Sequence, residues 1–522
     1  MDNCHKVCIF AALELPAYAE RTAYNHRMKN KVIIIGGGIS GLSAGIFAQK
    51  NNLDSIILER HLIPGGECTG WDRQGYHIDS CIHWMVGTLP GTETYRLWEE
   101  LGALGPDIPM VKHPAYLRFD GPDGQQFHLW NDLSRMEKEL LQLSPEDEKL
   151  IRQFVDDIRR YVVIESVTSR PMEQRSLCDH IAYFWSIRKA IMPHVRHAKQ
   201  SVGELSKRFH NKFIGDTMLA YLPETFYAEA LLYMYAVVTS GKAGIPAGGS
   251  KATVYRMKER YESLGGTLRC RAEVKRIIVE NDCAKGVELN DGTILEADAV
   301  IASCDPHVTL YDLLDGRYED TYFKTRYEDK DRFPLFSHAA VYYGCKTQMQ
   351  QTDADTIAFN TSRPFLMAGR EQQTLLVKNY QYEAGFAPEG HTVLQILIQQ
   401  NEADYEYYKH LRDTDIEAYK AEKQRIGDFI AQELEAHFPE LQGQLQLIEF
   451  TTSYSLTRFC RAYKGSYMPF VTRPNVERTF HNGRIKGLNG LYLAGQWLQP
   501  PGGLINAAIT GKFAVQRLIK DL

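Results

Sequence analysis

The stretch Lys31-Val-Ile-Ile-Ile-Gly-Gly-Gly-Ile-Ser-Gly41 decides the fold class of this chain. Its β-branched run predicts a short, buried strand of a parallel sheet, and the glycines that follow predict a tight turn into a helix. In such a turn Gly36 allows the chain reversal, Gly38 lets the backbone approach a pyrophosphate, and Gly41 lets the helix lie close against the strand. The stretch therefore predicts the start of a dinucleotide-binding α/β domain.

The residues after the turn support the same interpretation. Ile39 and Ser40 open the expected helix, whose unpaired N–H groups and positive dipole end suit phosphate groups. A second strand is expected at residues 55–58, and it ends at Glu59. An acid there accepts hydrogen bonds from the adenosine ribose hydroxyls and disfavours the 2′-phosphate of NADP. The alternative is a glycine-rich turn of another α/β fold, but here the motif, both strands and the acid occur together.

Composition narrows the class of protein. The chain has 522 residues, 44% hydrophobic and 24% charged, with a formal net charge of −5. It is long enough for two to four domain-sized units, and its charge gives no reason to expect a nucleic-acid partner. No apolar run reaches the roughly 18 residues that span a bilayer. The ten cysteines lack zinc-ligand spacing, so we expect no metal site and a reduced, cytoplasmic protein. Residues 1–27 are predicted to be a disordered extension.

The next segment favours FAD over NAD. After the second strand come Arg60, then Gly65, Gly66 and Glu67, and later Gly75-Tyr-His-Ile-Asp79. These motifs resemble the second signature of the large FAD superfamily that contains amine oxidases, phytoene desaturases and carotenoid isomerases. The resemblance implies FAD, with the glycine pair near the pyrophosphate and ribityl chain. We expect this FAD to be non-covalent; the alternative is attachment to Cys68 or Cys81, but neither position by itself supplies the activated thiolate that attachment needs. Glu67 stands where family members often carry arginine.

Two further segments complete the resemblance. A final core strand is expected at residues 490–495, and Gly495-Gln496 stands where many members have Gly-Asp. Gly503, Leu504 and Ile505 then begin an apolar helix. The resemblance places the start of this helix at the pyrimidine end of the flavin, where its dipole stabilises negative charge on the reduced ring. The resemblance also brings the backbone near Val274 to the adenine.

These segments define the expected domains. Residues 28–85, 245–310 and 450–522 are predicted to form a Rossmann-like FAD-binding domain, assembled from the N-terminal, middle and C-terminal parts of an α/β chain. Residues 86–244 and 311–449 are predicted to form an inserted α+β substrate or cap domain. Within it, strand-like runs occur at 335–344, 374–380 and 392–399, and a long helix is expected at 414–437.

The chain most resembles the phytoene desaturase, carotenoid isomerase and retinol saturase group, through Gly75–Asp79 and Cys81-Ile-His-Trp-Met-Val-Gly87. This implies an FAD-dependent oxidoreductase that acts on carbon–carbon bonds of a small apolar, polyene or isoprenoid-like substrate, by desaturation, saturation or isomerisation. His83 is the candidate catalytic residue, because its segment should pass near the flavin. The alternative is a histidine that hydrogen-bonds backbone beside the cofactor. The flavin's reductant is either NAD(P)H, bound transiently, or another redox partner.

Three alternatives remain open in the sequence. An amine oxidase-like enzyme would share the whole cofactor half. A prenyl-lipid escort protein is disfavoured by the intact glycine turn and ribose acid. The stretch Tyr183–Arg196 mixes aromatic and basic residues, which predicts either peripheral contact with a membrane surface or a packed cap helix with a solvated basic face. The sequence leaves the oligomeric state open.

Overall fold

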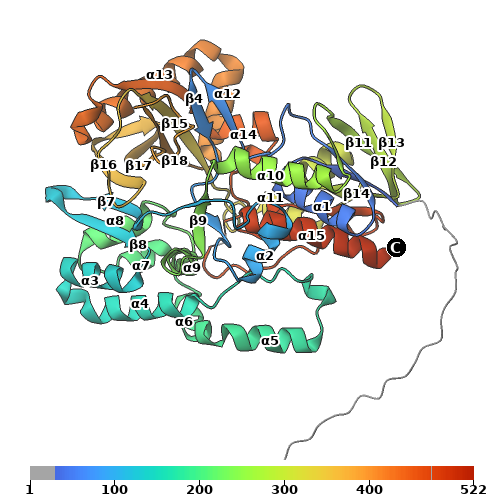
Figure 1. Cartoon of the computed structure of the whole chain (residues 1–522), viewed down its shortest axis with the longest axis horizontal. Helices are drawn as coiled ribbons and strands as arrows, with labels where there is room; N and C mark the ends of the chain where they lie inside the picture. The colour runs from blue at the N-terminus through green and yellow to red at the C-terminus, as the bar shows by residue number, and fades with distance from the viewer. Residues whose placement is uncertain (1–29, 472) are drawn as a thin grey trace, which may run out of the picture.

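The computed structural model describes residues 30–471 and 473–522, and Figure 1 shows the arrangement of its elements. The predicted extension at 1–27 lies outside the described residues. A five-stranded, wholly parallel sheet forms one end of the molecule. Its strands, in spatial order, are β10 (Thr267–Arg269), β2 (Asp54–Leu58), β1 (Lys31–Ile35), β14 (Ala299–Ala302) and β20 (Leu491–Leu493).

The strand β1 is buried on both faces, as its β-branched sequence predicts. Val32 and Ile34 pack with helices α1 (Ile39–Lys50), α10 (Gly249–Ser263) and α15 (Leu504–Asp521). Ile33 and Ile35 pack on the opposite face, against a three-stranded antiparallel sheet. That sheet consists of β11 (Val274–Glu280), β12 (Cys283–Leu289) and β13 (Ile294–Glu296). A parallel sheet covered on both faces agrees with the predicted Rossmann-like class.

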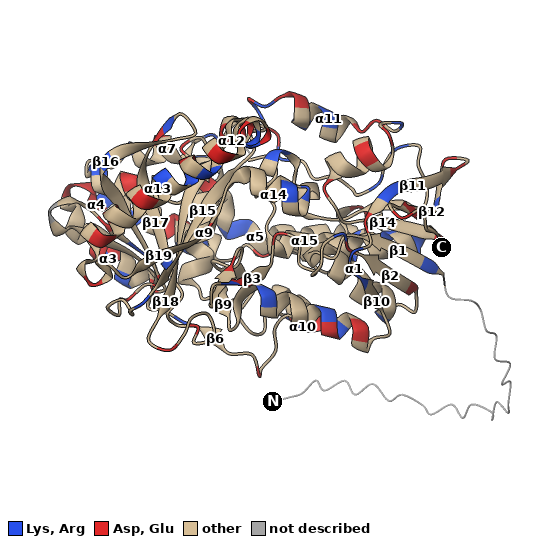
Figure 2. Cartoon of the chain, turned by 90° about the horizontal axis from the view of Figure 1, so that it is seen from above, with Lys and Arg blue, Asp and Glu red and all other residues tan. Residues whose placement is uncertain are grey.

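A seven-stranded sheet forms the other end of the molecule, and Figure 2 shows the two sheets apart with α15 between them. Its spatial order is β19 (Leu445–Thr451), β15 (Ser337–Cys345), β18 (Thr392–Gln400), β17 (Arg370–Asn379), β16 (Thr356–Met367), β7 (Ala115–Asp120) and β8 (Gln126–Trp130). Neighbours are antiparallel except β16 and β7. Because β19 runs across residue 450, the predicted boundary there falls inside a strand. The domain division itself stays a prediction.

Helices cover the faces of this larger sheet. One face packs on α12 (Glu402–Thr414) and α13 (Ile416–His437). Residues of β7 and β8 belong to a second cluster with α3 (Leu133–Leu143), α4 (Glu148–Tyr161), α7 (Val202–Ser206), α8 (Lys212–Leu219) and α9 (Ala228–Thr239). The predicted long helix is thus confirmed as α13, which begins two residues later than expected because the Asp415 side chain caps it.

The remaining α-helices and strands of the described residues are short. They are β3 (Gly70–Arg73), β4 (Tyr76–Asp79), β5 (Met85–Val86), β6 (Met110–Val111), β9 (Ala243–Pro246), α2 (Glu93–Glu100), α5 (Leu177–Ile187), α6 (Ile191–His197), α11 (Thr321–Glu328) and α14 (Ser453–Cys460). None of the described helices has the length and apolar character needed to cross a bilayer.

Candidate functional site

The glycine-rich turn after β1 leaves room for a ligand at the start of α1. Gly36 has a φ of +102°, a conformation that L side chains rarely adopt. A Cβ on Gly41 would lie 1.9 Å from the Gly36 carbonyl oxygen, so only glycine fits. Gly38 precedes α1 in an extended conformation and brings no side chain to cap the helix, and the first turn of α1 carries no acidic residue. The N–H groups of Ile39 and Ser40 are therefore suited to a diphosphate.

Glu59 is fixed beside this turn at the end of β2. Its two carboxylate oxygens accept hydrogen bonds from the backbone N–H of Gly37 (2.8 Å) and of His61 (2.7 Å). Arg60, in contrast, lies 3.3 Å from Glu273 and donates to the carbonyls of Arg458 and Phe459. Arg60 therefore ties the end of β2 to the residue before β11 and to α14.

The second glycine pair packs directly on the first glycine turn. The Gly65 N–H donates to the Gly37 carbonyl at 2.9 Å, and a Cβ on Gly66 would lie 3.7 Å from the Gly38 Cα. Gly65 and Gly66 both have positive φ, at +126° and +61°. Two glycine segments that are separated in sequence thus form one surface without side chains, as close backbone approach to a ligand requires.

Gln496 of the C-terminal motif contacts both Glu67, which follows the second glycine pair, and Gly503, which precedes α15. Its amide Nε2 donates to Glu67 Oε2 at 3.0 Å, and its Oε1 accepts from the Gly503 N–H at 3.0 Å. Burial, followed by the charge of Asp305, raises the pKa of Glu67 to about 8, while the Gln496 hydrogen bond opposes this shift. Glu67 is therefore a neutral acid at pH 7 and does not repel a diphosphate.

The helix α15 starts with Leu504 and Ile505 after Gly503, which has a φ of +96° and brings no capping side chain. A Cβ on Gly511 would lie 2.2 Å from the Ser40 carbonyl, so α1 and α15 touch closely. Gly495 has a φ of +133° and its N–H donates to Thr510 Oγ1 at 3.0 Å. Val274, the first residue of β11, is buried in the cluster below β1.

His83 lies in a buried polar network on the larger sheet. Its Nε2 is 2.9 Å from Gln395 Oε1, which also accepts the Tyr380 hydroxyl at 2.9 Å. The Gln395 amide nitrogen donates to the Tyr342 hydroxyl and to the Asp79 carbonyl. Because a carboxamide oxygen only accepts, His83 carries its proton on Nε2. Among the described residues, none hydrogen-bonds to His83 Nδ1, whose lone pair is the acceptor on this ring.

Both histidines near this network are uncharged. Burial, the charge of Lys378 and the neighbouring His338 lower the pKa of His83 to about 3, and burial lowers that of His338 to about 4. Lys378 itself is almost fully buried and paired with Asp355 at 2.8 Å. The positive charge of Lys378 is thus balanced by the negative charge of Asp355.

A band of aromatic side chains joins His83 to the C-terminal motif. The ring of His338 lies 4.5 Å from that of Tyr467, whose carbonyl accepts from Gln496. Trp84 Nε1 donates to the Tyr221 hydroxyl at 2.8 Å. The aromatic band as a whole consists of six residues that pack around these contacts: Trp84, Tyr116, Tyr221, Phe336, His338 and Tyr467.

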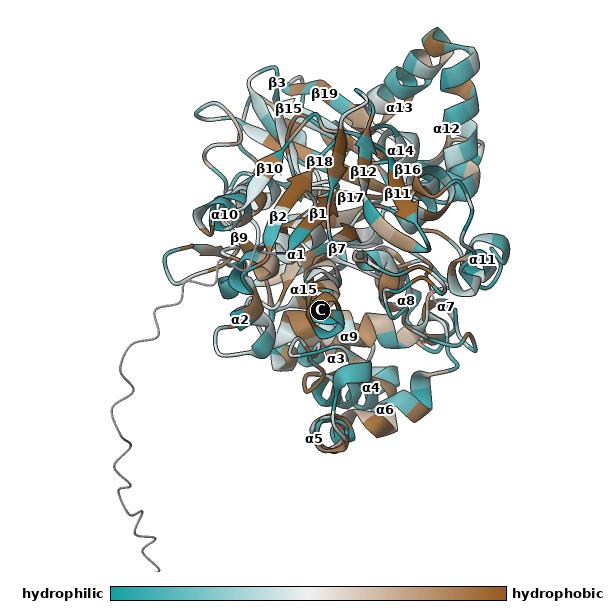
Figure 3. Cartoon of the chain, turned by 90° about the vertical axis from the view of Figure 1, so that its right-hand side faces the viewer, coloured by the Kyte–Doolittle hydropathy of each residue, from teal (hydrophilic) through white to brown (hydrophobic). Residues whose placement is uncertain are grey.

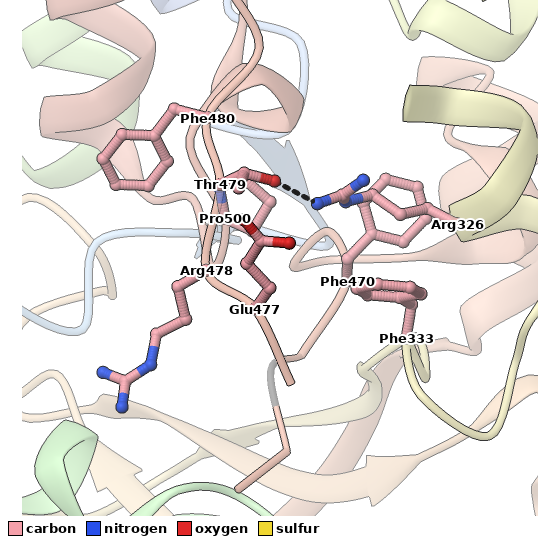
Figure 4. A pocket seen from close by; sticks show the side chains of 8 residues that line it. All are labelled: Arg326, Phe333, Phe470, Glu477, Arg478, Thr479, Phe480 and Pro500. Atoms are coloured by element: carbon pink, nitrogen blue, oxygen red, sulfur yellow. Dashed lines mark hydrogen bonds between the residues drawn. The ribbon is translucent and has the colours of Figure 1, made fainter. Parts of the chain in front are cut away.

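Two surface hollows lie away from these residues. Figure 4 shows the first, in which Arg326 hydrogen-bonds to Thr479 beside Phe333 and Phe470, while Arg478 points away. The second is lined by His77, Lys251, Tyr255 and Phe386, among others. Neither hollow includes any of the predicted cofactor residues, so neither is taken as the cofactor site. No His, Cys, Asp or Glu cluster suited to a metal occurs in the described ranges.

The family model described as "Flavin containing amine oxidoreductase" matches residues 39–519, which include most of the geometry above. The chain belongs to this flavin-containing amine oxidoreductase family. The resemblance to the FAD superfamily is thus confirmed, and membership implies FAD as the cofactor. The glycine surface, the uncapped α1 and the neutral Glu67 fit FAD.

Individual relatives and a solved structure agree with this family assignment. "Prolycopene isomerase 1, chloroplastic" of an Oncidium hybrid cultivar is 24% identical over 513 residues, covering 94% of this chain and 84% of that protein. "Phytoene desaturase (lycopene-forming)" of a Paracoccus species is also 24% identical, over 94% of this chain and 97% of its own. A solved protein of Pyrococcus furiosus has a TM-score of 0.58 at 16% identity, covering 94% of this chain and 97% of that chain. The chain is thus a distant relative of carotenoid desaturases and isomerases.

Most predicted site residues lie close to one another. The glycines, Glu59, Glu67, Gln496 and the start of α15 converge, whereas Arg60 turns to Glu273 and His83 is two side chains away from Gln496. Their cofactor roles stay predictions. Sequence reasoning missed His338, Gln395 and the Lys378–Asp355 pair. All but Asp355 lie in runs predicted as strands, but no local motif marks them.

Proposed function

We propose that this protein is an FAD-dependent oxidoreductase that acts on carbon–carbon bonds of a neutral, apolar substrate of the polyene or isoprenoid type. One observation carries the proposal: next to the cofactor residues lies an aromatic band with two neutral histidines, and the buried Lys378 is cancelled by Asp355. An environment of this kind suits a substrate without charge, because a desolvated ion would lack a partner. The distant carotenoid desaturases and isomerases point the same way.

Different residues of the chain bind the cofactor, orient the substrate and contact its reacting part. The glycine surface and the starts of α1 and α15 hold the diphosphate and the flavin edge. When bound, FAD supplies hydride acceptance or delivery at its N5 atom. The aromatic band orients the substrate and excludes water. His83 offers the Nδ1 lone pair as a hydrogen-bond acceptor, and its tautomer is fixed by Gln395.

We also infer that the FAD is not covalently attached. Cys68 and Cys81 flank the second glycine signature, and both are buried. The neighbouring Cys81, together with burial, raises the pKa of the Cys68 thiol well above its usual range. Attachment at Cys68 requires a thiolate, which this environment suppresses.

An amine oxidase activity is the second candidate, because the matching family model carries that description. The charge distribution argues against a protonated amine. Lys378 lies close enough to His83 to donate to its carbonyl at 3.2 Å, and its partner Asp355 is already engaged. The other buried acid nearby, Asp79, already accepts hydrogen bonds from Ser250 and the Cys81 N–H, and burial raises its pKa, which disfavours a free carboxylate for an incoming ammonium group.

The experiment is a substrate screen on the flavin-loaded protein in two arms: an anaerobic arm with electrons supplied by NADPH, NADH or dithionite, and an aerobic arm in which O2 is the electron acceptor. The products of an all-cis and an all-trans polyene are separated by chromatography, and their masses are measured by mass spectrometry. A gain of two hydrogens indicates saturation, a loss indicates desaturation, and an unchanged mass with a new retention time indicates isomerisation. Peroxide formation with amines and no change in any polyene would refute the proposal in favour of an amine oxidase.

A further inference from the structure

The helix α5 is apolar and yet exposed along its whole length. It begins with a capping box in which Ser176 and Asp179 bond each other's backbone N–H, and none of its residues is buried. Figures 1 and 3 show it at the lower edge of the molecule, away from both sheets. Its large apolar side chains are spaced at i, i+4, i+7 and i+8, on one face, and are 58–75% exposed: Leu177, Ile181, Phe184 and Trp185.

The helix α6 extends the same exposed apolar character. Met192 and Val195 are 60% and 69% exposed. The other side of α6 is held in place, because His197 bonds to Asp157 of α4 at 2.9 Å and His194 to Glu229 of α9 at 2.6 Å. The six residues Leu177, Ile181, Phe184, Trp185, Met192 and Val195 are called the α5–α6 patch below.

A patch of this kind requires a cover. An isolated helix as short as α5 is marginal in water, and most helical stability comes from packing of an apolar face. Contiguous apolar side chains at a surface mark a binding site for a protein or a membrane. Nothing within residues 30–471 and 473–522 covers the four apolar side chains of α5.

The charged residues around the patch indicate what kind of partner covers it. Residues 175–199 contain five lysines and arginines and a single acid, Asp179, in a chain whose net charge is −5. Arg188 stacks over the Trp185 ring at 4.6 Å, and Lys189 follows it at the end of α5. Aromatic and aliphatic side chains bordered by cations are typical of helices that lie in the interface of an anionic bilayer.

We propose that the α5–α6 patch binds the surface of a bilayer that contains anionic lipids, with Phe184 and Trp185 inserted among the headgroups and Arg188 and Lys189 paired with lipid phosphates. A second copy of the chain fits less well. A symmetric dimer would pack the same patch against itself, and would bring the basic borders of both copies together.

The test is flotation of the flavin-loaded protein with unilamellar vesicles. We expect binding to vesicles of mixed phosphatidylcholine and phosphatidylglycerol, at least tenfold weaker binding to phosphatidylcholine alone, and weakening by added salt. Phe184→Ser/Trp185→Ser should reduce binding to anionic vesicles at least tenfold. Arg188→Glu/Lys189→Glu should remove the preference for phosphatidylglycerol.

Matched controls are an exposed leucine and an exposed lysine elsewhere, Leu366→Ser on β16 and Lys420→Glu on α13. Both should bind vesicles like the unaltered protein, and all four variants should retain their flavin content, which verifies folding. Trp185 emission should also move to shorter wavelength on addition of anionic vesicles, and a Trp185→Phe variant should lose this change.

Two results would overturn the proposal. One is equal vesicle binding by the unaltered protein and the Phe184/Trp185 variant. The other is a dimer in solution that fails to bind vesicles and that the same variant converts to a monomer, since a second copy would then cover the patch.

Discussion

Replacing Glu67 by glutamine should change how FAD affinity depends on pH. Glutamine has the same shape, can still accept the hydrogen bond from Gln496, and carries no charge at any pH. In the unaltered protein the carboxyl is neutral up to its pKa of about 8 and negative above it. Since a diphosphate beside it favours the neutral form, FAD binding above this pH must take up one proton.

One proton sets the magnitude. The Kd for FAD should be constant well below pH 8 and rise by up to tenfold per pH unit above it, which is about 1.4 kcal/mol per unit. In the Glu67→Gln variant the rise above pH 8 should disappear, because Asp305, with a pKa of about 7, is already largely ionised there. The neighbouring thiol of Cys460 and hydroxyl of Tyr467 stay protonated throughout, since burial raises the pKa of both.

Asp305 is the neighbouring group that also titrates, because burial raises its pKa to about 7. Its charge helps to hold the proton on Glu67, so Asp305→Asn should move the rise in Kd to lower pH. The assay is quenching of FAD fluorescence on titration with apoprotein in buffers of constant ionic strength. An equal rise in the Glu67→Gln variant, or none in the unaltered protein, would refute the placement of Glu67 beside the diphosphate.

Three further predictions follow from the geometry. Gly41→Ala would place a Cβ 1.9 Å from the Gly36 carbonyl, so the purified variant should contain no flavin absorption, whereas normal flavin content would contradict the assigned turn. Lys378→Met leaves Asp355 buried without its partner and should lower the free energy of unfolding by about 3–5 kcal/mol, measured by thermal or urea unfolding. The double variant Lys378→Met/Asp355→Leu should lose less stability than the single variant. A larger loss in the double variant would show that the two charges are not a pair. His83→Asn should lower substrate-dependent flavin turnover ~10²-fold or more with unchanged flavin content. In the unaltered protein, turnover should show no titration of His83 above about pH 5, because that imidazole is already neutral there. Full turnover in the variant would assign His83 a structural role.

The cofactor half of the fold was predictable because local rules decide it. The residues Val32–Ile35 are buried on both faces of the sheet, and the turn after them has room only for glycine at Gly41, so sequence and structure constrain each other within a few residues. The contact of Glu67 with Gln496 was not predictable. These residues are far apart in the chain, and they meet because α15 packs on α1 through Gly511.

The substrate half was less predictable for the same reason. The runs that became β15, β17 and β18 were recognised as strands, but their register was not, and register alone brings His338 and Gln395 near His83. The strands β7, β8 and β16 were missed. In β16 a run of four buried residues, 356–359, precedes a bulge between Asn360 and Phe365, and buried and exposed residues alternate only after the bulge, so no single strand pattern spans the element.

The most direct test of the central claim is the visible absorption spectrum of the purified protein, before and after heat denaturation. The native protein should show two flavin bands, and free FAD should appear in the supernatant after the protein precipitates. Bands that remain with the pellet would contradict the non-covalent assignment. A colourless protein that also fails to take up added FAD would contradict the assignment of the glycine surface, and with it the proposed function.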